Sequence, residues 1–294
     1  MKRYNNNQKA RVDRIKMSMK GKICIVTGAN SGIGKATAMG LAKLDATVVM
    51  LCRSKERGEE AQKEIIELTG NSNVDLILCD LSSQKEIRSF VSEFKSKFQY
   101  LHVLINNAGI MTGKRNHCVD GYEMNFAINH LAPFLLTNLL LDVLKKSAPS
   151  RIINVGSAAH RMAKMDFDDL QCENKKPRFM KLYGSSKLAL TLVSYELSRK
   201  LEGSNVTVNV VHPGLINTNL GRDRSSVSTG FAKRFFKTPE VGAETSIYLA
   251  SSPEVEGITG KYYVKKEQKR SSKESYNEEY AKKLWEISVE MTNL

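Results

Sequence analysis

The stretch KICIVTGANSGIG, residues Lys22–Gly34, decides the fold. Its first half, Ile23–Val26, is a short apolar run with β-branched residues, which is typical of a strand buried on both faces of a parallel sheet. Glycines follow at positions 28, 32 and 34, and a helical pattern of small and apolar residues begins at Lys35. The sequence therefore predicts a strand, a glycine turn and a helix in immediate succession.

A strand, turn and helix in this order can bind phosphate. Exposed backbone N–H groups and aligned peptide dipoles at the helix N-terminus both favour an anion. Gly28 would permit the sharp turn, Gly32 the close approach of a pyrophosphate, and Gly34 tight packing of the helix on the strand. The spacing G-x-x-x-G-x-G differs from the commoner G-x-G-x-x-G fingerprint, and three turn glycines alone could be structural. The rest of the chain must decide between the two interpretations.

Strand-like and helix-like segments alternate along the whole chain. Further strands are predicted at 46–52, 74–79, 101–105, 151–155, 206–211 and 261–264. Further helices are predicted at 54–68, 83–98, 119–144 with a bend at Pro133, 179–201, 239–250 and 275–291. The alternation predicts a single α/β domain of Rossmann type, a doubly wound, mostly parallel seven-stranded sheet with helices on both faces. Ligands of such sheets bind beyond the carboxyl ends of the strands.

Charge divides the chain into a nearly neutral body and two basic segments. The net charge is +14, of which residues 1–22 carry +7 and residues 261–273 carry +5, leaving +2 for the rest. We therefore expect a basic N-terminal arm at 1–21, a catalytic domain at 22–264, and a basic linker with an amphipathic helix at 265–294. A nucleic-acid groove would need its charge on the folded body, so no nucleic-acid partner is expected. The arms are either simply solvated or attracted to an anionic membrane surface.

Several classes of protein are excluded by composition. The five cysteines form no C-x-x-C pair, so buried free thiols are expected, and the five histidines show no metal-ligand spacing, so no metal is expected. The longest apolar stretch, Phe126–Leu144, is interrupted by polar residues and a proline, which argues against a transmembrane helix. The N-terminus lacks the apolar core of a secretory signal. We expect a cytoplasmic protein, with peripheral contact at an intracellular (ER) membrane as the alternative.

Four residues are candidates for chemistry. Tyr183 and Lys187 lie four apart on a predicted helix and therefore share a face. An ammonium about 4 Å from a phenol, at an effective dielectric constant of about 20, stabilises the phenolate by about 4 kcal/mol, or roughly three pKa units. Ser157 follows a predicted strand, where its hydroxyl serves either a turn or a substrate oxygen. Asn129 lies on an apolar helical face and either caps a kink near Pro133 or holds a water.

Taken together, the motifs resemble the short-chain dehydrogenase/reductase family. They are TGANSGIG (27–34), NNAG (106–109), Asn129, Ser157, YGSSK (183–187) and HPG (212–214), in this order. The resemblance implies a nicotinamide dinucleotide, hydride transfer, Tyr183 as acid/base, Ser157 positioning the substrate oxygen, and Lys187 lowering the pKa of the tyrosine. Asn129 would hold a water that links Lys187 to solvent. The resemblance implies cofactor contacts at Gly28, Asn30, Ser31, Gly32, Ile33, Gly34, Asp80, Leu81, Asn107, Ala108, Gly109, Tyr183, Lys187, Pro213, Gly214 and Thr218.

The end of the second strand bears on which nicotinamide cofactor binds. A carboxylate there would hold the ribose 2′-hydroxyl of NAD, but the sequence reads Cys52-Arg53-Ser54 with no acid before Glu56. Arg53 can instead form a charge-assisted fork with a 2′-phosphate, and Lys35 would be a weaker second contact. The sequence therefore predicts NADP(H) over NAD(H).

The substrate is expected to be a small apolar alcohol or its aldehyde or ketone. CRS at 52–54, SIYLASSPEVEGITGKYY at 246–263 and the tail around LWEIS at 284–288 look like the retinol dehydrogenase branch, which implies retinoids or other lipid carbonyls. Residues 215–237 would form a substrate loop, whose phenylalanines at 231, 235 and 236 either pack on the body or line an apolar mouth. Alternatives are a carbonyl reductase of steroids, quinones or xenobiotics, or a non-catalytic dinucleotide-binding scaffold. Homodimers through the helices at 125–144 and 179–200 occur often in the family.

Overall fold

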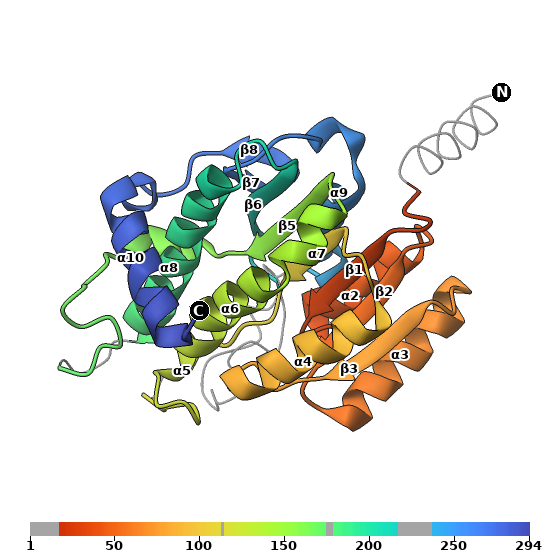
Figure 1. Cartoon of the computed structure of the whole chain (residues 1–294), viewed down its shortest axis with the longest axis horizontal. Coiled ribbons are helices and arrows are strands. Elements are labelled where there is room, and N and C mark those ends of the chain that lie inside the picture. The colour runs from red at the N-terminus through yellow and green to blue at the C-terminus, as the bar shows by residue number, and fades with distance from the viewer. Residues whose placement is uncertain (1–17, 113–114, 175–178, 217–236) are drawn as a thin grey trace.

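One eight-stranded sheet forms the centre of the molecule (Figure 1). The structure is a computed structural model that describes residues 18–112, 115–174, 179–216 and 237–294. In chain order the strands are β1 (Ile23–Thr27), β2 (Thr47–Cys52), β3 (Val74–Leu78), β4 (Val103–Asn106), β5 (Ser150–Val155), β6 (Val206–His212), β7 (Lys261–Val264) and β8 (Glu267–Lys269). Their order across the sheet is β3-β2-β1-β4-β5-β6-β7-β8. The predicted Rossmann-type α/β fold is confirmed.

The sheet is parallel from β3 to β7, and its order reverses between β1 and β4. On one side of β1, Val26 pairs with Met50 of β2, and on the other it pairs with Ile105 of β4. The chain thus builds one half of the sheet outward from β1 and the other half outward from β4. A cleft opens at the carboxyl ends of the strands where neighbouring crossovers lie on opposite faces, which is the usual ligand position in such sheets.

An eighth strand, β8, was not among the predicted strands. It pairs antiparallel with β7, with Tyr262 opposite Lys269. The two strands are joined by Lys265 and Lys266, both with positive φ (53° and 65°), as a two-residue hairpin turn requires. Lysines rarely occupy such positions, so the turn carries no Asn-Gly or Asp-Gly signal. Most of the basic segment 261–273 is therefore sheet and turn structure at the sheet edge.

Helices cover both faces of the sheet. Among them are α2 (Gly32–Ala42), α3 (Lys55–Thr69), α4 (Gln84–Lys97), α6 (Ala132–Leu139), α7 (Leu141–Lys146), α8 (Phe179–Lys200) and α9 (Pro239–Ser251). Apolar residues of α2, α3 and α9 form one buried cluster with the sheet, and those of α4, α6, α7 and α8 form another on the opposite face. Burial of both faces explains why the strands read as continuous apolar runs.

The predicted helix 119–144 is divided into shorter pieces. It contains the one-turn α5 (Met124–Phe126), a π-helical turn η1 (Ala127–Leu131), α6 and α7. Pro133 has no N–H to donate to the carbonyl of Asn129, four residues earlier, so a regular α-helix cannot run through this point. The bend expected at Pro133 therefore takes the form of a π turn centred on Asn129.

The C-terminal helix α10 (Glu278–Thr292) packs beside α8, as Figure 1 shows. Leu284 of α10 is fully buried in a third apolar cluster with residues of α8. Trp285 meets Phe134 of α6 edge to face, with ring centroids 4.8 Å apart. The amphipathic helix expected near 275–291 is thus an integral part of the core.

Within the described residues, no helix combines the length and the apolar character that crossing a membrane requires.

Packing at the glycine turn generates a stability prediction. A Cβ on Gly34 would lie 2.3 Å from the carbonyl oxygen of Gly28, and backbone cannot move away as a flexible side chain can. We expect Gly34→Ala to lower the free energy of unfolding by about 3 kcal/mol. Gly70 has φ +70° with nothing within 4 Å of its Cβ position, so Gly70→Ala should cost only about 1 kcal/mol. Guanidinium unfolding of both variants measures the difference, and equal losses would contradict the overlap argument.

Candidate active site

The glycine turn between β1 and α2 forms one end of a cleft. Gly28 and Gly32 adopt positive φ, 67° and 54°, and α2 begins at Gly32 with no acidic residue in its first turn. A Cβ on Gly28 would lie 3.1 Å from the Cα of Ala108, so the turn also packs against the end of β4. The N-terminus of α2 is therefore free of competing negative charge and able to receive a phosphate.

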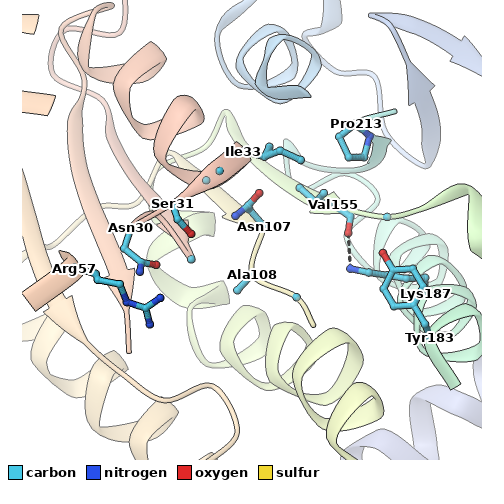
Figure 2. A pocket seen from close by; sticks show the side chains of 15 residues that line it. Asn30, Ser31, Ile33, Arg57, Asn107, Ala108, Val155, Tyr183, Lys187 and Pro213 are labelled. Carbon is cyan, nitrogen blue, oxygen red and sulfur yellow. Dashed lines mark hydrogen bonds between the residues drawn. The ribbon is translucent and has the colours of Figure 1, made fainter. Parts of the chain in front are cut away.

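The cleft lies at the carboxyl ends of the strands and has a volume of about 290 Å³ (Figure 2). Its lining consists of Gly28, Asn30, Ser31, Gly32, Ile33, Gly34, Arg57, Asn107, Ala108, Gly109, Val155, Gly156, Tyr183, Lys187 and Pro213. Most of these residues belong to the motifs that the sequence singled out. Arg57, Val155 and Gly156 were not predicted. The last two immediately precede Ser157 and could have been inferred from its position at a strand end.

The NNAG turn after β4 is fastened to β1 by Thr27. The buried Thr27 hydroxyl accepts hydrogen bonds from the backbone N–H of Asn107 (2.9 Å) and of Ala108 (2.8 Å). The side chain of Asn107 donates in turn to the Thr27 carbonyl at 2.8 Å. These three bonds satisfy groups at the strand ends and hold the two walls of the cleft at a fixed separation.

Tyr183 and Lys187 lie side by side on α8, as their spacing predicted (Figure 2). Both are buried, and the ammonium of Lys187 donates a hydrogen bond of 2.8 Å to the carbonyl of Val155. Burial lowers the pKa of Lys187 to about 8. Burial also raises the pKa of Tyr183, while a hydrogen bond with the Ser157 side chain acts in the opposite direction. The net direction for the phenol is upward, contrary to the lowering expected from Lys187, because desolvation outweighs the other influences.

Ser157 is held by a histidine that the sequence did not single out. The ring Nδ1 of buried His160 lies 2.6 Å from the Ser157 carbonyl, and its Nε2 accepts from the N–H of Ser272 at 2.9 Å. The ring hydrogen must therefore be on Nδ1, where it is donated to Ser157. Burial lowers the pKa of His160, which keeps the ring neutral. The only available signal was its place three residues after Ser157.

Asn129 lies behind the cleft wall and is fully buried. Its Oδ1 accepts from the N–H of Ile110 (2.8 Å), and its Nδ2 donates to the Ile110 carbonyl and to Ser186 Oγ (both 2.9 Å). Asn129 Oδ1 and Lys187 Nζ lie 3.0 and 3.4 Å from the point that a Cβ on Gly109 would occupy. The side chain is thus bonded to the loop after β4 and to Ser186, next to Lys187, and not to the backbone at the kink near Pro133.

The two cationic residues predicted to contact a 2′-phosphate, Arg53 and Lys35, each lie beside a carboxylate. Arg53 does not line the cleft, and its exposed guanidinium lies 3.7 Å from Asp80. Lys35 is hydrogen-bonded to Glu64. Arg57, in the first turn of α3, does line the cleft, and Figure 2 shows its side chain on the side of Asn30, away from Tyr183.

Other predicted contacts lie near the cleft or outside the described residues. Leu81 lines a small cavity next to Ala108, and Gly214 follows the cleft-lining Pro213. Thr218 and most of the predicted substrate loop, including its three phenylalanines, lie outside the described residues. In the described ranges, no group of three His, Cys, Asp or Glu side chains is arranged to hold a metal ion.

Known proteins resemble this chain along almost its whole length. The sequence profile of the family described as short chain dehydrogenase matches residues 22–228. Retinol dehydrogenase 13 of Homo sapiens is 43% identical over 287 residues, which cover 95% of this chain and 87% of that protein. Polyprenol dehydrogenase of Homo sapiens is 42% identical over 93% of this chain and 86% of its own length. The structure of a Pseudomonas aeruginosa RhlG/NADP active-site complex is 27% identical, with a TM-score of 0.70 over 84% of this chain and 95% of that one.

The buried lysine generates a prediction of pH-dependent stability. Because its pKa is about 8 in the folded state and 10.5 ordinarily, the folded protein binds fewer protons than the unfolded chain between these values. Stability should therefore rise with pH from about 8 to about 10.5, as the cost of burying the charge disappears. We expect Lys187→Met to raise the free energy of unfolding at pH 7 by about 3 kcal/mol and to flatten this rise.

Denaturant unfolding of both proteins at pH 7, 8.5 and 10 measures this effect. A Lys187→Met protein that is less stable than the wild type at pH 7 would contradict the assignment of Lys187 as a destabilising buried cation.

Proposed function

We propose, since this chain belongs to the short-chain dehydrogenase/reductase family and to its retinol dehydrogenase branch, that it is an NADP(H)-dependent oxidoreductase of apolar, isoprenoid-like alcohols and carbonyls. Family membership makes it an oxidoreductase that binds a nicotinamide dinucleotide; the choice of NADP, the residue roles and the substrate class are our proposal. The observation that carries it is one cleft with a glycine-lined helix N-terminus at one end and Tyr183 with Lys187 at the other.

The cleft lining fits a dinucleotide. The glycines at 28, 32 and 34 carry no side chains at three points of the turn, and a Cβ at Gly28 or Gly34 would meet Ala108 or Asn107 of the loop after β4. Gly28, Asn30, Ser31, Gly32, Ile33 and Gly34 would hold the pyrophosphate, and Asn107, Ala108 and Gly109 the adenosine side. When bound, the nicotinamide supplies or accepts the hydride. Every other step falls to residues of this chain.

Tyr183 is proposed as the acid/base. A raised pKa keeps the phenol protonated at neutral pH, which is the form that gives a proton to a carbonyl oxygen as it becomes an alcohol. The Ser157 hydroxyl, whose interaction with the Tyr183 side chain opposes the rise in the pKa of the phenol, would hold that oxygen. The Lys187 ammonium would then stabilise the phenolate, since a cation nearby favours the charged form of an acid. In the oxidative direction the same groups act in reverse.

Asn129 is proposed to serve the proton path through its backbone. Both Nδ2 hydrogens of its side chain are used, one on Ile110 and one on Ser186. Pro133 cannot donate to the Asn129 carbonyl as a helical residue would. That carbonyl is therefore the group we propose to hold a water between Lys187 and solvent.

An apolar substrate is favoured by the surroundings of the Tyr183 end. Three large apolar side chains, in the segments that follow Ser157, precede Tyr183 and follow Pro213, are exposed: Met162 by 69%, Met180 by 42% and Leu215 by 66%. Met180 lies one turn before Tyr183 on α8, and Leu215 follows the HPG motif. Retinol and polyprenol, named for two relatives, are both isoprenoid alcohols. We therefore propose a long apolar alcohol or carbonyl as the substrate.

The substitution Tyr183→Phe, which removes only the phenol oxygen, tests the catalytic proposal. We expect purified protein to oxidise NADPH in the presence of retinal or a prenyl aldehyde, and Tyr183→Phe to lose at least about 100-fold in kcat. NADPH binding, followed by fluorescence titration, should change little because the phenyl ring remains. Turnover by Tyr183→Phe at the wild-type rate would refute the acid/base role. NADPH binding without turnover of any carbonyl in the wild type would favour the non-catalytic scaffold.

Cofactor preference tests the cation assignment. We propose that Arg57, which lines the cleft, is the main contact of the 2′-phosphate and that Arg53, turned toward Asp80, is a lesser one. Loss of a charge-assisted hydrogen bond should lower kcat/KM for NADPH about 10-fold or more in Arg57→Ala, with little effect on NADH. Arg53→Ala, the matched control, should show a smaller change. If the ratio of kcat/KM for NADPH to kcat/KM for NADH is unaltered in Arg57→Ala, Arg57 does not contact the 2′-phosphate.

A further inference from the structure

We propose that His130 and Ser288 are positioning residues through which the C-terminal helix α10 fixes Asn129 beside the cleft. The effect that this proposal predicts on catalysis rests on the function proposed above, in which Asn129 acts as a neighbour of Lys187. Its structural part, a coupling between α10 and the loop after β4, stands on the contacts alone.

The π turn η1 lies between the cleft wall and α10. Asn129 and His130 are consecutive residues of this turn, and both are fully buried. Asn129 bonds to Ile110 on the side of the cleft, whereas His130 bonds to Ser288 of α10. Figure 1 shows α10 running alongside α8 close to the region of α5 and α6. A displacement of α10 would therefore be passed to Asn129 through its chain neighbour.

The bond between His130 and Ser288 has a defined direction. The Ser288 hydroxyl donates its hydrogen to the Leu284 carbonyl at 2.6 Å, so it can only accept from the ring Nε2 of His130 at 2.8 Å. His130 Nε2 must carry the hydrogen, and its Nδ1 has no protein partner among the described residues. Burial lowers the pKa of His130 to about 3, so the ring stays neutral. One hydrogen bond of defined direction thus joins the ring to α10.

The far end of α10 is fixed independently. The hydroxyl of Tyr122 and the amide of Gln84 donate to the carbonyl of Met291, at 2.9 and 2.8 Å. Arg88 donates to the carbonyl of Thr292 at 2.5 Å. Carbonyls at a helix C-terminus have no partner within the helix, so these side chains satisfy them and anchor the helix to α4 and to Tyr122. Ser288, one turn earlier, is consequently a fixed point against which the π turn is held.

The N–H of Ile110 is a direct reporter of Asn129, because its hydrogen bond is to Asn129 Oδ1. We expect Ser288→Ala and His130→Leu each to speed amide hydrogen exchange at Ile110 about tenfold, since loosening the π turn opens this bond more often. Thr292→Val is the matched control, because Thr292 is also fully buried on α10 but its hydroxyl bonds within the helix, to the Ser288 carbonyl. It should leave Ile110 exchange unchanged.

A second measurement separates positioning from chemistry. For Ser288→Ala we expect kcat per bound NADPH to fall about tenfold with KM for NADPH unaltered. His130→Gln retains an N–H donor for Ser288 and should recover most of kcat and of Ile110 protection, which a proton-carrying imidazole would not permit. Wild-type Ile110 exchange in a folded Ser288→Ala protein, or equal acceleration in Thr292→Val, would overturn the proposal. If the wild type turns over no carbonyl, the proposed function fails alone, and the exchange rates still decide the coupling.

Discussion

The structure depends on the reversal of strand order between β1 and β4 and on the hydrogen bonds that Thr27 makes across it. Parallel strands whose crossovers diverge to opposite faces leave a gap at their carboxyl ends. The Thr27 hydroxyl and carbonyl accept three hydrogen bonds from Asn107 and Ala108, so the gap has fixed walls although Gly28, Gly32 and Gly34 place no side chains in it. The glycine turn, the end of β5 and the start of α8 are all arranged around this opening.

Polar groups of the site are buried at a cost that backbone partners only partly offset. Lys187 has the carbonyl of Val155, Asn129 has both backbone groups of Ile110, and His160 has the Ser157 carbonyl. Each of these partners belongs to a strand end or the loop after it. The same bonds that make burial tolerable therefore also orient the functional groups, and the strongly lowered pKa of Lys187 shows that the compensation is incomplete.

Tertiary structure decided positions that local patterns left open. Arg53 follows β2 directly and was the evident cation, but it turns toward Asp80, while Arg57 reaches the cleft from the first turn of α3. The segment around Lys265 and Lys266 reads as a basic linker, yet its hairpin turn adds β8 to the sheet.

The sequence by itself determined the alternation of strands and helices, the glycine turn, and the shared face of Tyr183 and Lys187, because these follow from periodicity and from contacts within one turn of helix. The sequence also predicted that the helix is interrupted near Pro133, because the missing N–H of a proline is a local property. Only the tertiary structure decided that this interruption of the helix is a π turn, that His160 holds Ser157, and that α10 contacts His130. Those features depend on hydrogen bonds between residues more than a hundred positions apart or on partners that no local pattern specifies, as with Ser272 and Ser288.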